Sequence, residues 1–247
     1  MKDKDAVLAA TAELQKKLYD LLYLMFAEGR RSLLIILHGI DTSGKDGVVR
    51  FLFESANPQG LQVFAFKKPS EEELRHDYIW RCHRHAPEAG YATIFNRSYY
   101  EEVTTVMVHP ELLQAQHLPV NVERDRDIFK KRYEQINQFE KMLSENGTMV
   151  VKFLLDISKN EQKERLEARL KDRSRNWKFS ADDLKERKSW NAFMKAFKKM
   201  VKNTDTKHAP WYVIPSDKKW MRNYEIAKVL VKTLEDVKMV FPKAVQK

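Results

Sequence analysis

Short runs of hydrophobic residues alternate with longer amphipathic segments along this chain. The runs carry little polar alternation, which is typical of strands buried on both faces of a sheet. They predict strands over residues 33–37, 61–66, 91–95, 149–155 and 211–214.

Apolar residues recur at helical spacing in the segments between and around these runs. The predicted helices cover 6–29, a stretch after residue 45 that carries Val48, Val49 and Leu52, then about 70–85, 121–145, 159–171, 180–201 and 217–241. Glu140 is a polar exception on the apolar stripe of its helix. Strands that alternate with helices predict an α/β fold, with a parallel sheet covered by helices on both faces.

The first predicted strand ends in a glycine-rich segment with the spacing G-x-x-x-x-G-K, which is typical of a loop that binds phosphate through backbone N–H groups. A strand before it and a helix after it favour this interpretation over a plain turn. The position that ordinarily carries a magnesium-binding Ser or Thr is Asp46, and Asp41 adds a second carboxylate. This substitution suggests a phosphoryl donor other than a plain nucleoside triphosphate. The candidate phosphate-binding residues of the loop are Gly39, Thr42, Ser43, Gly44, Lys45 and Asp46.

The third predicted strand ends in Asn96 and Arg97. An ordinary Walker B strand ends in Asp, which helps to hold magnesium, whereas an amide oxygen is a weaker ligand that still orients a metal-bound water. Arg97 offers a planar fork that suits phosphate oxygens. Ligands of parallel sheets bind at the carboxyl ends of the strands, so we expect this turn and the glycine-rich loop to face one crevice. A surface turn with an exposed arginine is the alternative.

Two basic segments are candidates for binding a chain of phosphates. The first comprises Lys67 and Lys68 after the second strand and Arg81 and Arg84 on the following helix, and its alternative is a solvated basic face. The second lies around Trp177 and includes Arg169 and Lys178. In nucleotide kinases a basic segment at this place closes as a lid over the transferring group.

The composition of the chain limits the class of protein to which it can belong. A chain of 247 residues with 43% hydrophobic residues suits one large globular domain, which we assign to residues 1–247 with the lid at about 165–185. The single cysteine allows no internal disulfide, and no signal peptide or membrane span is evident, so we expect a cytoplasmic protein without a membrane partner. A net charge of +10 attracts polyanions but does not choose among them.

Several segments in the same order resemble the family-2 polyphosphate kinases. They are GIDTSGKDG (39–47), NPQG (57–60), KKPS (67–70), ELRHDYIWR (73–81), FNRSYYE (95–101), WKFS (177–180) and APWYVIP (209–215). The resemblance covers nearly the whole chain. It departs from the family at Asn96, where many members have Asp, and at Arg173, where a proline often stands.

This resemblance implies a three-layer α/β/α P-loop kinase fold with a helical lid, and an enzyme that transfers the terminal phosphoryl group of inorganic polyphosphate to a nucleotide with Mg²⁺. The residues that match Asp41 and Lys45 are catalytic in the family, and the one that matches Arg97 grips phosphate. The Asn-Arg-Ser motif resembles the branch that phosphorylates both AMP and ADP to give ADP and ATP, a reversible reaction suited to ATP regeneration.

The same residues suggest a mechanism without a general base, because a nucleotide phosphate oxygen is already ionised near neutral pH. We assign Asp41 and Asn96 to Mg²⁺, Lys45 to the transferring group and Arg97 to a donor or acceptor phosphate. Arg169 and Lys178 are expected to close over the reacting centre, and Glu101 to help place the acceptor nucleotide.

Two rival interpretations remain open. One is an ATP-dependent nucleoside monophosphate kinase on the same fold, against which Asp46 argues. The other is a basic nucleic-acid-binding protein with a vestigial loop, but no nucleic-acid recognition motif is visible, so we expect no such partner. We also expect a homo-oligomer, either a dimer or a tetramer.

Overall fold

The computed structural model describes residues 3–174, 176–178 and 186–243. A five-stranded parallel sheet forms its centre, with the strand order β2-β3-β1-β4-β5. The strands are β1 (Ser32–His38), β2 (Leu61–Ala65), β3 (Ala92–Asn96), β4 (Thr148–Asp156) and β5 (Trp211–Pro215). All five predicted strands are thus confirmed to within two residues, and so is the parallel sheet.

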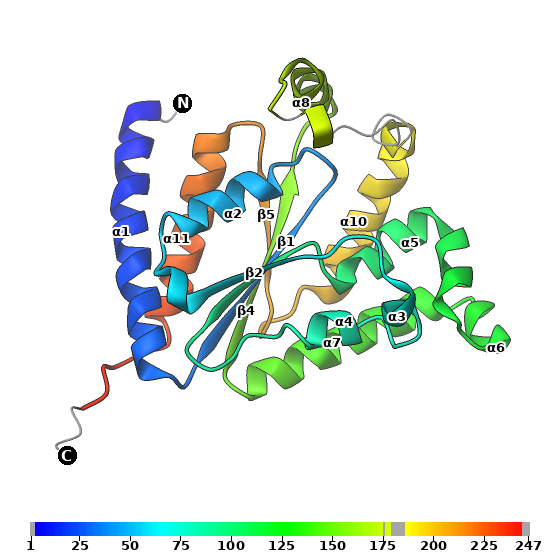
Figure 1. Ribbon diagram of the computed structural model, residues 1–247, viewed down its shortest axis with the longest axis horizontal. Helices are drawn as coiled ribbons and strands as arrows, with labels where there is room; N and C mark the ends of the chain where they lie inside the picture. Colours follow the sequence, from blue (N-terminus) through cyan, green and yellow to red (C-terminus); the bar gives the residue numbers. More distant parts are fainter. Residues whose placement is uncertain (1–2, 175, 179–185, 244–247) are drawn as a thin grey trace.

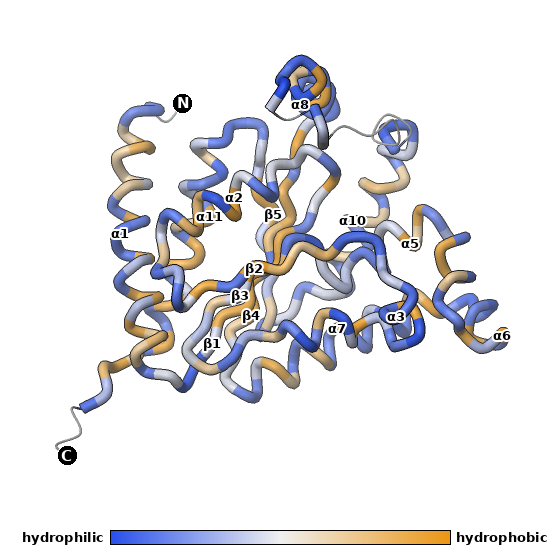
Figure 2. Tube along the Cα trace, viewed as in Figure 1, coloured by the Kyte–Doolittle hydropathy of each residue, from blue (hydrophilic) through white to orange (hydrophobic). Residues whose placement is uncertain are grey.

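Helices cover both faces of this sheet (Figure 1). One face carries α1 (Lys4–Glu28), α2 (Lys45–Phe53) and α11 (Lys219–Glu235), and the other carries α7 (Ile128–Glu145) and α10 (Trp190–Thr204). The alternating side chains of β1 explain this layering, since Leu33 and Ile35 pack on the first face and Leu34 and Ile36 on the second. Figure 2 shows the hydrophobic residues gathered in these central strands. The predicted α/β class is confirmed.

The remaining helices are short or lie at the edge of the sheet. They are α3 (Glu71–Leu74), α4 (Trp80–His83), α5 (Thr105–Val108), α6 (Val120–Glu123) and α8 (Lys159–Lys171), with 3₁₀ turns η1 (Pro58–Gly60), η2 (Tyr99–Val103), η3 (Pro110–Gln116), η4 (Asn176–Lys178) and η5 (Arg187–Ser189). Within the described part of the chain, no helix is long and apolar enough to cross a membrane. The one cysteine, Cys82, is buried in α4 with 1% of its surface exposed, and burial raises the pKa of its thiol to about 12.

Two predicted helices are wrong in their continuity. The capping box of Ser70 and Glu73 exists, but the helix that it starts ends at Leu74 and a new one begins at Trp80. Asp77 causes the break, because its carboxylate accepts the backbone N–H groups of Ile79 and Trp80 at 3.0 Å. Such side-chain bonds compete with a continuous helix.

The same competition divides the predicted helix 121–145. The Asp125 carboxylate accepts the backbone N–H of Asp127 at 2.8 Å, between the end of α6 and the start of α7. The helix predicted to end at residue 241 stops at Glu235. The one predicted over 180–201 extends to Thr204, and its expected first turns, over residues 180–185, lie outside the described residues.

Candidate functional site

The glycine-rich loop joins the carboxyl end of β1 to the first turn of α2, as predicted. Gly39 has φ of 141°, and a Cβ atom there would lie 2.7 Å from the Leu155 carbonyl oxygen, so only glycine fits. Gly44 precedes α2 with φ of 107°. The first N–H groups of α2, which no helical carbonyl can accept, therefore face the crevice where an anion would bind.

Lys45 lies inside this loop. Its ammonium donates to the carbonyl oxygens of Gly39 at 2.6 Å and of Ile40 at 3.2 Å, and the residue is only 8% exposed. Burial lowers the pKa of Lys45 to about 8, and the nearby Arg97 charge acts in the same direction. Asp41 and Glu101 offset part of this effect. The site therefore holds a desolvated cation at the point where phosphate charge would develop.

Asp41 and Arg97 form an ion pair across the crevice. The Arg97 Nη2 donates to Asp41 Oδ1 at 2.7 Å. Burial alone would raise the pKa of Asp41, but Lys45 and Arg97 outweigh it, so the pKa lies below its ordinary value. Two elements far apart in sequence are thus joined, because β1 and β3 are neighbours with Leu37 opposite Asn96. The expectation of one shared crevice is confirmed.

Arg97 adopts a left-handed backbone conformation with φ of 65°. This conformation is unfavourable for a residue with a side chain, and it persists only where the surroundings fix it. The Arg97 backbone N–H donates to the Leu37 carbonyl oxygen at 3.0 Å, which ties the turn to the end of β1. The strained residue is therefore the one that points its guanidinium at the phosphate loop.

Asn96 and Asp46 contact each other. The Asn96 amide donates to Asp46 Oδ1 at 3.0 Å, which leaves the amide oxygen of Asn96 as an acceptor. Asp46 stands in the first turn of α2, where a negative charge is favourable.

The side-chain oxygens of Asn96, Asp46 and Asp41 are of the kind that Mg²⁺ prefers. Across the described residues, no group of three or more His, Cys, Asp and Glu side chains stands ready for a metal. Mg²⁺ fits this sparse set, since it ordinarily takes one or two carboxylates and keeps substrate phosphates and waters as its other ligands.

Glu101 completes the inner part of the crevice. Thr105 donates its hydroxyl to Glu101 Oε2 at 2.5 Å, and Glu101 Oε1 lies 3.9 Å from the Arg97 Nε. On its other side Glu101 Oε1 lies 3.7 Å from Nδ1 of His38, a residue that sequence reasoning missed. Glu101 is therefore placed among the predicted catalytic residues.

His38 is 1% exposed and neutral, because burial lowers its pKa to about 4. Its Nε2 lies 3.2 Å from the Thr104 hydroxyl, whose proton goes to the Tyr100 carbonyl oxygen. The Nε2 must then carry the ring proton, so Nδ1 is an acceptor. Among the described residues, Nδ1 has no hydrogen-bond partner.

The first basic segment lies at the same edge of the sheet. The Phe66 N–H donates to the Asn96 carbonyl oxygen at 3.1 Å, which places Lys67 and Lys68 just beyond the end of β3 as exposed side chains. Arg81 is turned toward this segment, because its Nη2 donates to the Lys67 carbonyl oxygen at 2.7 Å. Arg84 instead stacks over the Trp80 ring at 4.6 Å.

The lid prediction falls partly outside the described residues, which omit 175 and 179–185. Arg169, on α8, lies close enough to Asp41 that its charge helps to lower the pKa of that carboxyl. Lys178 ends η4, and Phe179 and Ser180 lie outside the described residues. The structure thus brings Arg169 to the crevice.

Two arginines that were not among the predicted site residues hold the loop from behind. Arg165 donates to the carbonyl oxygens of Thr42 at 2.9 Å and Ser43 at 3.1 Å, and Arg222 donates to that of Gly44 at 3.3 Å. Arg222 is 3% exposed, and burial lowers its pKa to about 10. Because these arginines hold the loop carbonyl groups away from the crevice, the N–H groups of the loop point into it. Arg165 belongs to a visible basic run, but no sequence signal marks Arg222.

Comparisons with known proteins agree with this geometry. A family model described as polyphosphate kinase 2 matches residues 1–242. The chain is 44% identical over 227 residues to an ADP-polyphosphate phosphotransferase of Rhodopseudomonas palustris, an alignment that covers 92% of this chain and 78% of that protein. It is 41% identical over 239 residues to an AMP/ADP-polyphosphate phosphotransferase of Meiothermus ruber, with 97% and 85% covered.

A solved structure is similar over the whole chain. The crystal structure of polyphosphate kinase 2 from Arthrobacter aurescens TC1 superimposes with a TM-score of 0.91 at 38% sequence identity, and the match covers 100% of this chain and 84% of that one.

Proposed function

Because the chain belongs to the polyphosphate kinase 2 family, we infer that it transfers the terminal phosphoryl group of inorganic polyphosphate to AMP or ADP, giving ADP or ATP. The observation that carries this function is the convergence of Lys45, Asp41 and Arg97 at the carboxyl edge of the sheet. The reaction is reversible, because one phosphoanhydride bond is exchanged for another. The chain is therefore a phosphotransferase.

The transfer breaks the bond between the terminal phosphorus of polyphosphate and its bridging oxygen. An ionised oxygen on the terminal phosphate of the nucleotide forms the new bond to the same phosphorus. No general base is needed, so catalysis consists of alignment and charge stabilisation. The loop N–H groups and the Lys45 ammonium would bind the oxygens of the transferring group, while Arg97 would hold an adjacent phosphate.

Polyphosphate is a linear polyanion, and a row of cations at the edge of the sheet suits it. We propose that Lys67, Lys68 and Arg81 bind its distal phosphates, with Arg84 at the outer end. When both substrates are bound, Arg169 of α8 and Lys178 would close over the transferring phosphoryl group. Glu101 would help to place the acceptor nucleotide.

We propose Mg²⁺ as the cofactor, held by Asp41 and Asn96 with Asp46 close by. When bound, the metal neutralises charge on the phosphate oxygens. The Asn96 amide is oriented by its bond to Asp46, so an amide oxygen rather than a carboxylate would face the ion. Mg²⁺ suits this site because Asp41 and Asn96 supply only a few oxygen ligands, which leaves its other positions for substrate phosphates.

Asn96→Asp should change the magnesium dependence of the reaction. The substitution replaces a neutral ligand by a charged one, so we expect half-maximal activity at a lower Mg²⁺ concentration. The measurement is a magnesium titration of ATP formation for both proteins, with Asn203→Asp, on the far helix α10, as the matched control. A titration that does not move would exclude Asn96 from the metal site.

The choice of donor separates this function from an ATP-dependent monophosphate kinase. Purified protein is given ADP, polyphosphate and Mg²⁺ without ATP, and ATP is measured by luminescence. We expect steady ATP formation that requires polyphosphate. A second reaction with ATP and AMP alone tests the rival enzyme, which would form ADP there. In the first reaction the rival enzyme would make ATP and AMP from two ADP molecules, and this ATP would not require polyphosphate.

We further propose a cytoplasmic location and assembly into a dimer or tetramer. The exposed apolar side chains Leu8, Tyr19 and Tyr23 of α1, together with Phe241, offer a surface for such assembly. Light scattering of the purified protein measures the mass directly, and the mass of a single chain would contradict this proposal.

A further inference from the structure

The turn η2 presents one side chain to the crevice and buries the rest. Tyr99, Tyr100, Glu102 and Val103 are between 0% and 7% exposed, whereas 29% of the Glu101 side chain is exposed. Glu101 points at the predicted catalytic residues, and Arg97 stands two residues before the turn begins. The position of both side chains therefore depends on how η2 is held.

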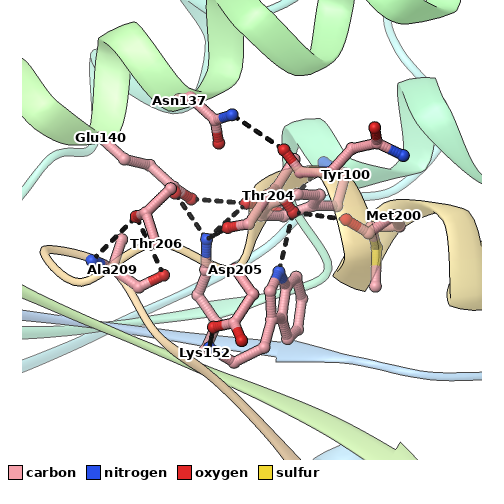
Figure 3. Close-up of polar contacts among 12 residues, drawn as sticks. Tyr100, Asn137, Glu140, Lys152, Met200, Thr204, Asp205, Thr206 and Ala209 are labelled. Carbon is pink, nitrogen blue, oxygen red and sulfur yellow. Dashed lines mark hydrogen bonds and ion pairs between the residues drawn. The ribbon is translucent and has the colours of Figure 1, made fainter.

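The buried ion pair of Glu140 and Lys152 holds the two tyrosines of η2. Figure 3 shows this pair together with Tyr100. The Tyr99 and Tyr100 hydroxyls donate to Glu140 Oε1 on α7, at 2.9 and 2.8 Å. Lys152, on β4, donates to Glu140 Oε2 at 2.6 Å, to the Tyr100 hydroxyl at 2.8 Å and to the Thr204 carbonyl oxygen at 2.7 Å. All three donors of the Lys152 ammonium are thus used.

A second buried pair holds Glu102, the next inward-facing residue of the turn. Glu102 Oε2 accepts from Arg132 of α7 at 3.0 Å and from Gln116 at 2.6 Å. The Tyr100 carbonyl oxygen accepts the Thr104 hydroxyl at 2.7 Å. Three successive inward side chains of η2 are consequently bonded, directly or through a carboxylate, to the helix and strand beneath them.

Stability alone does not explain the Lys152–Glu140 pair. Both side chains are fully buried, and the desolvation of two charges commonly cancels the attraction between them. A fully bonded polar network, however, permits one orientation where an apolar core would permit several. The unfavourable backbone conformation of Arg97 requires such a support.

We propose that Glu140 and Lys152 are positioning residues for phosphoryl transfer, which act through Tyr99 and Tyr100 to hold Arg97 and Glu101 in place. The inference rests on the proposed function, because it assumes that Arg97 and Glu101 serve that reaction. Neither Glu140 nor Lys152 touches the crevice, since the two tyrosines lie between them and Glu101.

The test removes the hydrogen bonds from the two tyrosine hydroxyls to Glu140 and leaves the Glu140–Lys152 ion pair intact. Tyr99→Phe/Tyr100→Phe removes both hydroxyls from Glu140 while Lys152 keeps its bonds to Glu140 and Thr204. The matched control is Tyr133→Phe on α7, since the buried Tyr133 hydroxyl has no hydrogen-bond partner in the described part of the chain. Each variant is assayed with ADP and polyphosphate well below its unfolding midpoint.

We expect kcat of the double variant to fall by about tenfold or more, because small displacements of aligned groups slow a reaction strongly. The KM for polyphosphate should stay within about twofold, since Lys67 and Lys68 lie outside η2. The control should match the wild type in both constants. A folded double variant with wild-type kcat would mean that the hydroxyls serve stability alone, and would overturn the inference.

Two further measurements keep the outcome decisive. If the double variant does not fold, Tyr100→Phe alone leaves Glu140 bonded to Tyr99, and its kcat should fall by a smaller factor; an unchanged kcat there would refute the proposal. Hydrogen exchange of the amides of residues 98–104 should accelerate in the double variant and not in the control, with no substrate present. A wild-type protein that makes no ATP would refute the proposed function instead, whatever the exchange rates show.

Discussion

Lys45→Ala should lower kcat for ATP formation by about 100-fold to 1,000-fold, which is the usual effect of removing one preorganised donor to a developing charge. The ammonium is held by two loop carbonyl oxygens in a desolvated position. A water molecule in the same place could not replace it, because water carries no positive charge. We expect the fold to survive, because the variant removes a charge whose burial is unfavourable. The measurement is kcat beside the midpoint of thermal unfolding.

Lys198→Ala serves as the control, since Lys198 is an exposed lysine of α10 far from the loop. It should leave both quantities unchanged. A Lys45→Ala variant that keeps more than about a tenth of the wild-type kcat would remove the lysine from the transition state.

The pH profile gives an independent view of the same residue. The pKa of Lys45 is lowered from 10.5 to about 8, so the free enzyme loses this charge as the pH rises through that value. We therefore expect kcat/KM for polyphosphate to fall above pH 8. Bound phosphate favours the ammonium form, so kcat should fall only at higher pH. A kcat/KM that stays flat between about pH 7 and 9.5 would contradict the assignment.

Lys152→Met should lower the free energy of unfolding by about 3–5 kcal/mol, the usual result of leaving one partner of a buried ion pair alone. The Glu140 carboxylate would remain inside the protein with two tyrosine hydroxyls but no cation. For a chain of this length the loss corresponds to a fall of about 10 °C in the midpoint of unfolding. Denaturant titration at pH 7.5 measures it.

Lys141→Met is the matched control, because Lys141 lies on α7 in an exposed pair with Glu145 at 3.6 Å, and it should change stability by less than about 0.5 kcal/mol. Glu140→Gln/Lys152→Met should recover part of the loss, since it removes the lone charge. The loss in Lys152→Met should also shrink at lower pH: a buried carboxyl has a raised pKa in the folded state, so protonation favours that state. Equal loss in the single and double variants would contradict an electrostatic origin.

Much of the fold could be predicted from the sequence because the strands are nearly continuous apolar runs. Residues 33–37 read as a strand buried on both faces, and the structure packs its alternate residues into two separate cores. The helix breaks at Asp77 and Asp125 could not be predicted. Each depends on a carboxylate that folds back onto nearby backbone N–H groups, and an exposed Asp in a helix gives the same periodicity as one that ends it.

In the candidate site, too, some features could be predicted from the sequence and others could not. The phosphate loop and the Arg97 turn follow strands that are visible in the sequence, and a parallel sheet brings their ends together. His38 and Arg222 were missed because each reads as part of a strand or helix, and only the tertiary structure shows what they face. Glu140 was noticed as an exception on its stripe, but its partner Lys152 lies in a strand read as apolar.

The burial of Cys82 makes this chain convenient for spectroscopy. A thiol that stays protonated and inaccessible at neutral pH reacts poorly with maleimides, and the sequence holds no other cysteine. One cysteine introduced at an exposed position of α8, such as Lys163→Cys, would therefore accept a fluorophore selectively in the native background. The dye could then report, in real time, how the helix that carries Arg169 responds when polyphosphate and nucleotide are added.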